Sequence, residues 1–141
     1  MLHRLAALAA LILGVLAFSV PAVADTDHPM DDMPATHTAD KGMTVRLSVA
    51  KDAMKGWNLN VRTRAFRWAP EHASMAHRRG EGHAHLYVDG VKITRIYGPW
   101  HYVGALTPGK HVVRVTLNGN DHGDYVRAGK PLAASTTVTV P

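Results

Sequence analysis

From residue 43 onward, apolar and polar residues alternate along the chain in short runs. Residues 45–49 and 57–61 both alternate in this way, and residues 51–56 between them are rich in turn-forming types. A period of two places successive side chains on opposite faces of a β-strand. The pattern therefore predicts two half-buried strands joined by a turn. The alternation slips at Ala65-Phe66, which predicts a bulge at that point.

The same alternation continues through the rest of the chain. Asp89-Gly90 is a strong signal for a two-residue hairpin, and three further turns or loops are expected at Gly98-Pro99, Thr107-Pro108-Gly109 and residues 118–131. The strands predicted between these points cover residues 83–88, 91–97, 111–117 and 132–140.

The number and spacing of these runs predict the fold class. No window of about 11 or more residues after the first 24 has helical spacing. About six or seven short strands at this spacing predict an all-β domain, an antiparallel β-sandwich of immunoglobulin-like or cupredoxin-like type. The order of the strands does not follow from the pattern.

The first 24 residues have a different character. His3 and Arg4 precede an almost unbroken apolar run over residues 5–20, and Pro21-Ala22-Val23-Ala24 follows it. The run is shorter than the roughly 20 residues that cross a bilayer, and the small residues after it form a cleavage pattern. We expect a cleavable signal peptide over residues 1–24, a periplasmic or secreted protein, and no membrane span after cleavage.

Residues 25–42 are polar, contain two prolines and show no periodicity. Such a segment buries little apolar surface, so we expect a flexible leader and a single β-sandwich domain over residues 43–141. The leader carries His28, Met30, Met33 and His37. These donors suit weak capture of copper on a mobile segment, and a plain linker is the alternative.

Composition narrows the chemistry. The chain has no cysteine, which excludes disulfides and thiolate metal sites, and its formal net charge of +5 is scattered along the sequence. We therefore expect no nucleic-acid partner. The motifs of zinc proteases, of serine hydrolases and of phosphate-binding loops do not occur, so the sequence does not predict an enzyme.

Histidine is unusually frequent, and nine of the ten histidines follow residue 24. The sharpest motif is His83-Ala84-His85 on the predicted strand 83–88. Residues i and i+2 of a strand share one face, with their Cα atoms about 6–7 Å apart. Two imidazoles at this spacing can bind one metal ion. A pair of solvated polar side chains is the alternative.

Nearby loops offer further ligands for the same ion. Met75 and His77 precede the strand, and Asp121-His122 lies in the polar loop before the last strand. His122 would complete a three-nitrogen site that suits copper(II) or zinc, with Asp121 orienting it from outside the ligand set. The thioether of Met75 would favour copper(I).

Two families resemble parts of this pattern. The motif His83-Ala84-His85 on a strand resembles copper–zinc superoxide dismutase, although the cysteine pair of that family is missing. The signal peptide, the His- and Met-rich leader, the all-β domain and the late loop Asn120-Asp121-His122-Gly123 together resemble small periplasmic copper-handling β-sandwiches of the CopC type. Those domains begin with a histidine after cleavage, whereas Asp25 stands first here.

The resemblance and the residues together predict an exported protein that binds a transition metal for storage, delivery or tolerance. Copper is the expected ion, with zinc as the alternative, and an envelope metal-transport protein is the expected partner. The competing hypothesis is a non-metal module that binds an envelope protein or a glycan through its aromatic segment at residues 100–102 and its basic rim. A superoxide-dismutase-like enzyme is a minor alternative.

Overall fold

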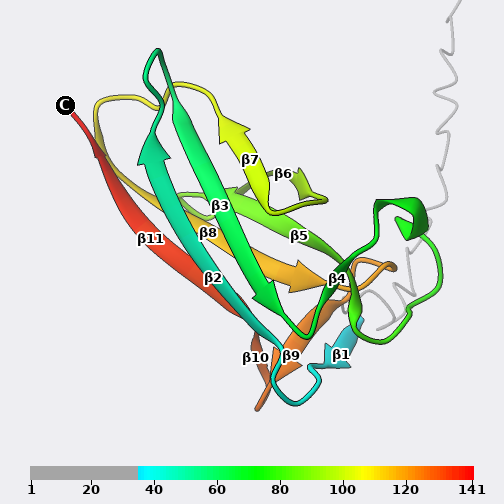
Figure 1. Cartoon of the computed structure of the whole chain (residues 1–141). Helices are drawn as coiled ribbons and strands as arrows, with labels where there is room; N and C mark the ends of the chain where they lie inside the picture. Colours follow the sequence, from blue (N-terminus) through cyan, green and yellow to red (C-terminus); the bar gives the residue numbers. More distant parts are fainter. Residues whose placement is uncertain (1–34) are drawn as a thin grey trace, which may run out of the picture. The chain divides into compact units, whose positions relative to one another are not determined.

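The structure, a computed structural model, describes residues 35–141. The predicted signal peptide and residues 25–34 of the leader lie outside the described residues. Eleven strands and one short 3-10 helix make up the described part (Figure 1). Their bounds are β1 Thr36–Thr38, β2 Thr44–Lys51, β3 Trp57–Arg64, β4 Arg67–Trp68, η2 Pro70–His72, β5 Glu81–Val88, β6 Val91–Ile96, β7 Trp100–Val103, β8 Gly109–Asn118, β9 Asp124–Arg127, β10 Lys130–Pro131 and β11 Ala133–Val140.

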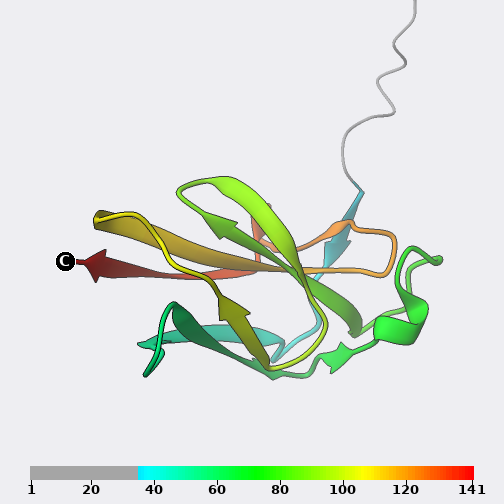
Figure 2. The same cartoon turned by 90° about the horizontal axis from the view of Figure 1, so that it is seen from above.

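The strands form two sheets that lie in two layers (Figure 2). The smaller sheet has the order β2-β3-β7, and the larger, eight-stranded sheet has the order β1-β9-β8-β5-β4 with β6, β10 and β11 paired to its members. The all-β prediction is confirmed. The prediction of a purely antiparallel sandwich with six or seven strands is wrong, because β1–β9 and β4–β5 pair in parallel and several strands are very short.

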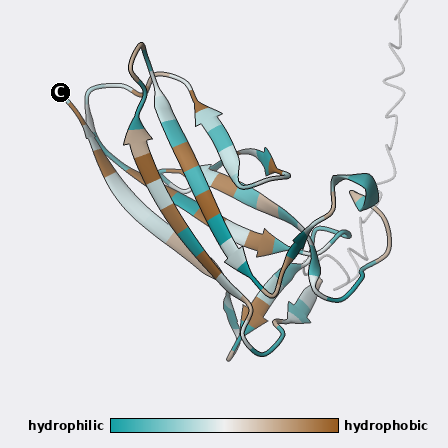
Figure 3. Ribbon diagram, viewed as in Figure 1, coloured by the Kyte–Doolittle hydropathy of each residue, from teal (hydrophilic) through white to brown (hydrophobic). Residues whose placement is uncertain are grey.

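The core lies between the two sheets and comes from the alternating apolar positions. The banding of hydrophobic and polar residues along β2 and β3 is visible in Figure 3. In β5 the inward row contains Ala84 and Leu86, both fully buried. The buried apolar cluster consists of Met43, Leu59, Val61, Ala84, Leu86, Ile96, Val103, Val113, Val115, Leu117, Tyr125 and Val138. Period two therefore determines which face of each long strand meets the core.

Two local irregularities follow the sequence signals. Asp89 and Gly90 have φ angles of 52° and 82°, the two positive values that a tight hairpin between β5 and β6 requires. Ala65 has a φ of 50°, where the alternation slips. At that point the chain leaves the β2-β3-β7 sheet and enters β4, which pairs with β5 of the other sheet. The slip thus marks a crossing between sheets and not the expected bulge, since the β2–β3 register is continuous through Arg64.

Three segments expected to be irregular contain strands. The aromatic segment 100–102 belongs to β7, and the polar loop 118–131 contains β9 and β10. The end of the expected leader forms β1, held by hydrogen bonds from Asp124 N to Ala35 O (2.9 Å) and from Ala39 N to Val126 O (2.8 Å). These strands have only two to four residues, too few for alternation to reveal them. Within residues 35–141, no helix is long and apolar enough to cross a membrane.

Gly82 at the start of β5 lies against the backbone of β8. Its φ of 154° disfavours a side chain, and a Cβ there would collide with the carbonyl oxygen of Asn118. We therefore predict that Gly82→Ala lowers the free energy of unfolding by about 1–3 kcal/mol. Gly98→Ala is the matched control, since a Cβ at Gly98 meets no atom within 4 Å. It should change stability by no more than about 0.5 kcal/mol in urea unfolding. Equal stability of the two variants would contradict the close approach of β5 and β8.

Candidate metal centre

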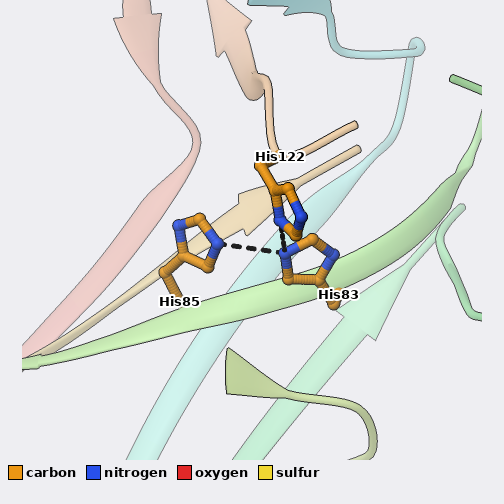
Figure 4. A group of neighbouring side chains, drawn as sticks. All are labelled: His83, His85 and His122. Atoms are coloured by element: carbon orange, nitrogen blue, oxygen red, sulfur yellow. Dashed lines mark hydrogen bonds between the residues drawn. The ribbon is translucent and has the colours of Figure 1, made fainter. Parts of the chain in front are cut away.

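The paired strands β5 and β8 form the base of the site. Ala84 and Leu86 point into the core, so His83 and His85 lie on the outer face of the eight-stranded sheet. His83 pairs with Asn118 of β8, at the end of that strand. The loop 119–123 follows directly and carries His122, which reaches back over the outer face of β5 (Figure 4).

The three histidines bring their nitrogens together. His83 Nε2 lies 3.0 Å from His85 Nε2 and 3.1 Å from His122 Nδ1, and one donor atom of each residue lies within 4.8 Å of the others. Nitrogens bound tetrahedrally to one ion at about 2.0–2.1 Å would be roughly 3.3 Å apart. We call His83, His85 and His122 the triad. Its geometry is close to that of a three-nitrogen metal site.

Burial keeps the triad uncharged. His83 and His85 are only 1% and 5% exposed. Loss of hydration lowers the pKa of His83 to about 4 and that of His85 to about 3, with the neighbouring His122 and Lys92 lowering them further. Burial also lowers the pKa of His122. The imidazoles are therefore neutral near pH 7, which is the form that binds metal ions.

The close contacts of the triad cannot all be hydrogen bonds. Lys92 Nζ lies 3.2 Å from His85 Nε2, and an ammonium group only donates, so His85 Nε2 accepts from it with its single lone pair. His83 Nε2, 3.0 Å away, therefore has no acceptor at His85 Nε2. A cation among the three nitrogens would account for their close approach, and its binding would require Lys92 to release the lone pair of His85.

Asn118 fixes the loop that carries His122. This fully buried side chain donates to Asp124 Oδ1 (2.6 Å) and to the His122 carbonyl oxygen (3.2 Å), and it accepts from Thr116 Oγ1 (2.8 Å). Gly119 N also donates to Gly123 O across the base of the loop. The backbone of His122 is thus held at both ends, in a left-handed conformation with a φ of 70°.

Ser74 contacts the ring nitrogen of His122 that faces away from His83. Its hydroxyl lies 3.0 Å from His122 Nε2, and its backbone N–H donates to the Asn120 carbonyl oxygen at 2.8 Å. With Nε2 engaged by a hydroxyl, Nδ1 of the same ring is the atom directed at the triad. Neither Ser74 nor Asn118 carries a sequence signal, because both are ordinary polar residues in ordinary polar surroundings.

A buried carboxylate joins the loop to the start of β5. Glu81 accepts from Asn120 Nδ2 (3.1 Å), contacts His72 Nδ1 (2.5 Å) and forms an ion pair with Arg67. Burial raises the pKa of Glu81, but the hydrogen bonds from Arg67, His72 and Asn120 outweigh it and bring the pKa to about 2. Glu81 therefore stays ionised and holds Asn120, next but one to His122, against the strand that carries His83.

A hollow lies along β6, beside the triad. It has a volume of about 470 Å³ and is lined by Lys92, Ile93, Thr94, Arg95 and Tyr97, with no triad residue in its lining. Tyr97 lies against His83, with ring centroids 5.5 Å apart, and Lys92 contacts His85. The hollow and the triad therefore share these two neighbours.

His77 and His111 lie outside the triad. His77 belongs to a second group, with His37 and Asp121, and therefore not to the triad that it was expected to complete. Met75 follows Ser74 and is 49% exposed, so its role as a further ligand stays a prediction. His111 contacts Asp89 Oδ2 (2.6 Å) and Thr107 O (2.8 Å), a satisfied structural histidine.

Comparison with family models, with curated proteins and with solved structures gives no match. The resemblance to CopC-type domains therefore stays a prediction. The chain's own residues define the class: an all-β protein of two sheets with a histidine cluster that could hold a metal ion.

The lowered pKa values predict how the metal-free protein responds to acid. Histidines of the unfolded chain titrate near 6.5, whereas His83 and His85 in the fold resist protonation down to about 4 and about 3. Protons therefore favour the unfolded chain. The resulting loss in the free energy of unfolding is absent above about pH 6.5 and grows as the pH falls toward 4.

Urea unfolding of chelator-treated protein at pH 7 and pH 5 measures this effect. The free energy of unfolding should be lower at pH 5, and His85→Leu should reduce the difference because it removes one of the buried titrating groups. An unchanged difference in His85→Leu would show that His85 is not held neutral by burial.

Proposed function

We propose that this protein is an exported copper-binding protein in which His83, His85 and His122 hold the ion. One observation supports the proposal. Three neutral imidazoles, two on a paired strand and one on a loop held by hydrogen bonds, bring their nitrogens to about the separation expected of nitrogens that bind one metal ion. The alternative, a solvated pair of histidines on the strand, does not agree with exposed fractions of 1% for His83 and 5% for His85.

Three features favour copper over other divalent ions. Imidazole nitrogens suit copper and zinc better than calcium or magnesium, and copper(II) forms the more stable complexes at a given nitrogen site. Three protein nitrogens leave one position for water or an incoming ligand. A methionine, Met75, lies one residue from the serine that contacts His122, and a thioether at that position would support copper(I) after reduction.

The arrangement suits storage and delivery. Two ligands are fixed on β5, whereas the third comes from a loop. A partner that offers its own ligands could take the ion stepwise, with His122 leaving before the strand pair. An envelope metal-transport protein is the partner this proposal names, with copper tolerance as the physiological result.

Copper titration tests the triad. The variants His83→Gln, His85→Gln and His122→Gln should each weaken copper(II) binding by about 100-fold or more, since even groups outside a ligand set contribute about 10–100-fold. Competition with a chromophoric chelator measures the affinity, and electron paramagnetic resonance should show coupling to several nitrogens in the wild type.

The matched control is His101→Gln on β7, because this histidine lies in the other sheet. It should bind copper as the wild type does. Wild-type affinity in the three triad variants would rule out the triad as the copper site.

The aromatic strand β7 supports a second candidate function. Trp100 and Tyr102 stand two residues apart on this strand and are 69% and 51% exposed, as expected of a surface that stacks on a glycan or packs on a protein. On this hypothesis Trp100→Ala abolishes cell-envelope binding and leaves copper affinity unchanged. Superoxide removal by the copper-loaded protein, faster than by free copper, would instead favour the enzyme alternative.

A further inference from the structure

A second group of potential ligands lies on the other side of the loop 119–123. His37 comes from β1, His77 from the segment after η2, and Asp121 from the loop itself. One donor atom of each lies within 4.8 Å of the others. His37 Nε2 contacts both oxygens of Asp121, at 2.8 Å and 3.1 Å. The group thus combines two imidazoles with a carboxylate.

One nitrogen of this group has no partner. Nδ1 of His77 is buried and makes no hydrogen bond within the described residues. A buried polar atom without a partner costs roughly 1–3 kcal/mol, and most such atoms in folded proteins are satisfied. Burial also lowers the pKa of His77, so its ring is neutral and Nδ1 can carry a lone pair. The unpaired nitrogen therefore points to a ligand.

A glycine lets the loop lie close to this nitrogen. A Cβ at Gly119 would lie 2.7 Å from His77 Nδ1 and 3.0 Å from Asp121 Oδ1, closer than ordinary contact. The φ angle of Gly119 is not positive, so backbone conformation does not require glycine there. The missing side chain instead permits the close approach of the loop backbone to the two donor atoms.

From these observations we propose that His37, His77 and Asp121 form a second cation site, which takes zinc(II). Two imidazoles and one carboxylate are a common donor set for zinc, with water in the fourth position. The proposal does not depend on the triad binding copper, since the two groups share no residue.

Binding at this site requires a small rearrangement. The rings of His37 and His77 are stacked, with centroids 3.5 Å apart and planes 6° apart. Imidazole lone pairs lie in the ring plane, so parallel rings cannot both direct one at the same ion. One ring must tilt. Gly119 has no side chain to oppose this tilt on the side of His77 Nδ1, and Tyr125 lies against both rings, 5.9 Å and 5.6 Å away between centroids.

The site would join segments far apart in the sequence. His37 is held by the parallel pairing of β1 with β9, where it lies opposite Tyr125. His77 belongs to the connection between η2 and β5, and Asp121 to the loop between β8 and β9. An ion bound to all three stabilises the folded chain over the unfolded one. Zinc is therefore expected to raise the unfolding temperature.

Equilibrium dialysis against zinc chloride, followed by elemental analysis, tests the proposal. His77→Phe keeps an aromatic ring beside Tyr125 but removes both nitrogens, and it should bind one zinc ion fewer than the wild type. His37→Gln should lose the same ion, which guards against misfolding of a single variant. The His101→Gln control should bind as the wild type. Unchanged zinc content in folded His77→Phe and His37→Gln would overturn the site.

The double variant His83→Gln/His85→Gln separates this proposal from the proposed function. If only the second site exists, the double variant binds as much zinc as the wild type and His77→Phe binds less. If only the triad binds, the pattern is reversed. Nitrogen-15 spectra of the imidazoles give an independent reading. Zinc should shift the ring nitrogens of His37 and His77 in the double variant, and unshifted resonances there would overturn the proposal.

Discussion

The register of β5 against β8 is the constraint on which the rest of the structure depends. It sets Ala84 opposite Leu117 in the core and His83 opposite Asn118 on the outer face. A slip by one residue would exchange the two faces, placing two histidines among apolar side chains. The burial of Ala84 and Leu86 therefore fixes the position of His83 and His85 on the opposite face. The candidate metal centre is therefore positioned by apolar core residues on the opposite face of β5, and not by packing of its own side chains.

The second constraint is the polar network around the loop 119–123. Its two buried amide side chains, Asn118 and Asn120, bind Asp124 and Glu81. Buried polar groups are costly unless they are satisfied, and once satisfied they specify one arrangement. Asn118 makes three hydrogen bonds, whereas Oδ1 of Asn120 has no partner within the described residues. Glu81 begins the strand that carries His83, so the network joins loop and strand directly. This is why a loop residue, His122, can lie 3.1 Å from a strand residue with a sequence separation of 39.

The sequence predicts these features to different extents. The shared face of His83 and His85 follows from period two, and the location of His122 in a polar loop near the end of the chain made it a reasonable third ligand. The place of His77 could not be predicted. The position of His77 depends on His37 of β1, whose parallel pairing with β9 joins residues 88 positions apart, as in His37 and Tyr125. A strand of three residues has no periodicity, so the sequence predicts a flexible leader for this segment. Ser74 and Asn118 act through contacts that only the fold creates.

Asp121 and His122 are neighbours in the chain but belong to different ligand groups. Their side chains leave the loop in different directions, one toward β1 and one toward β5. Three nitrogens suit copper(II) or zinc, and two nitrogens with a carboxylate oxygen are a common donor set for zinc. The loop thus carries one ligand of each candidate group, with no residue shared between the two groups.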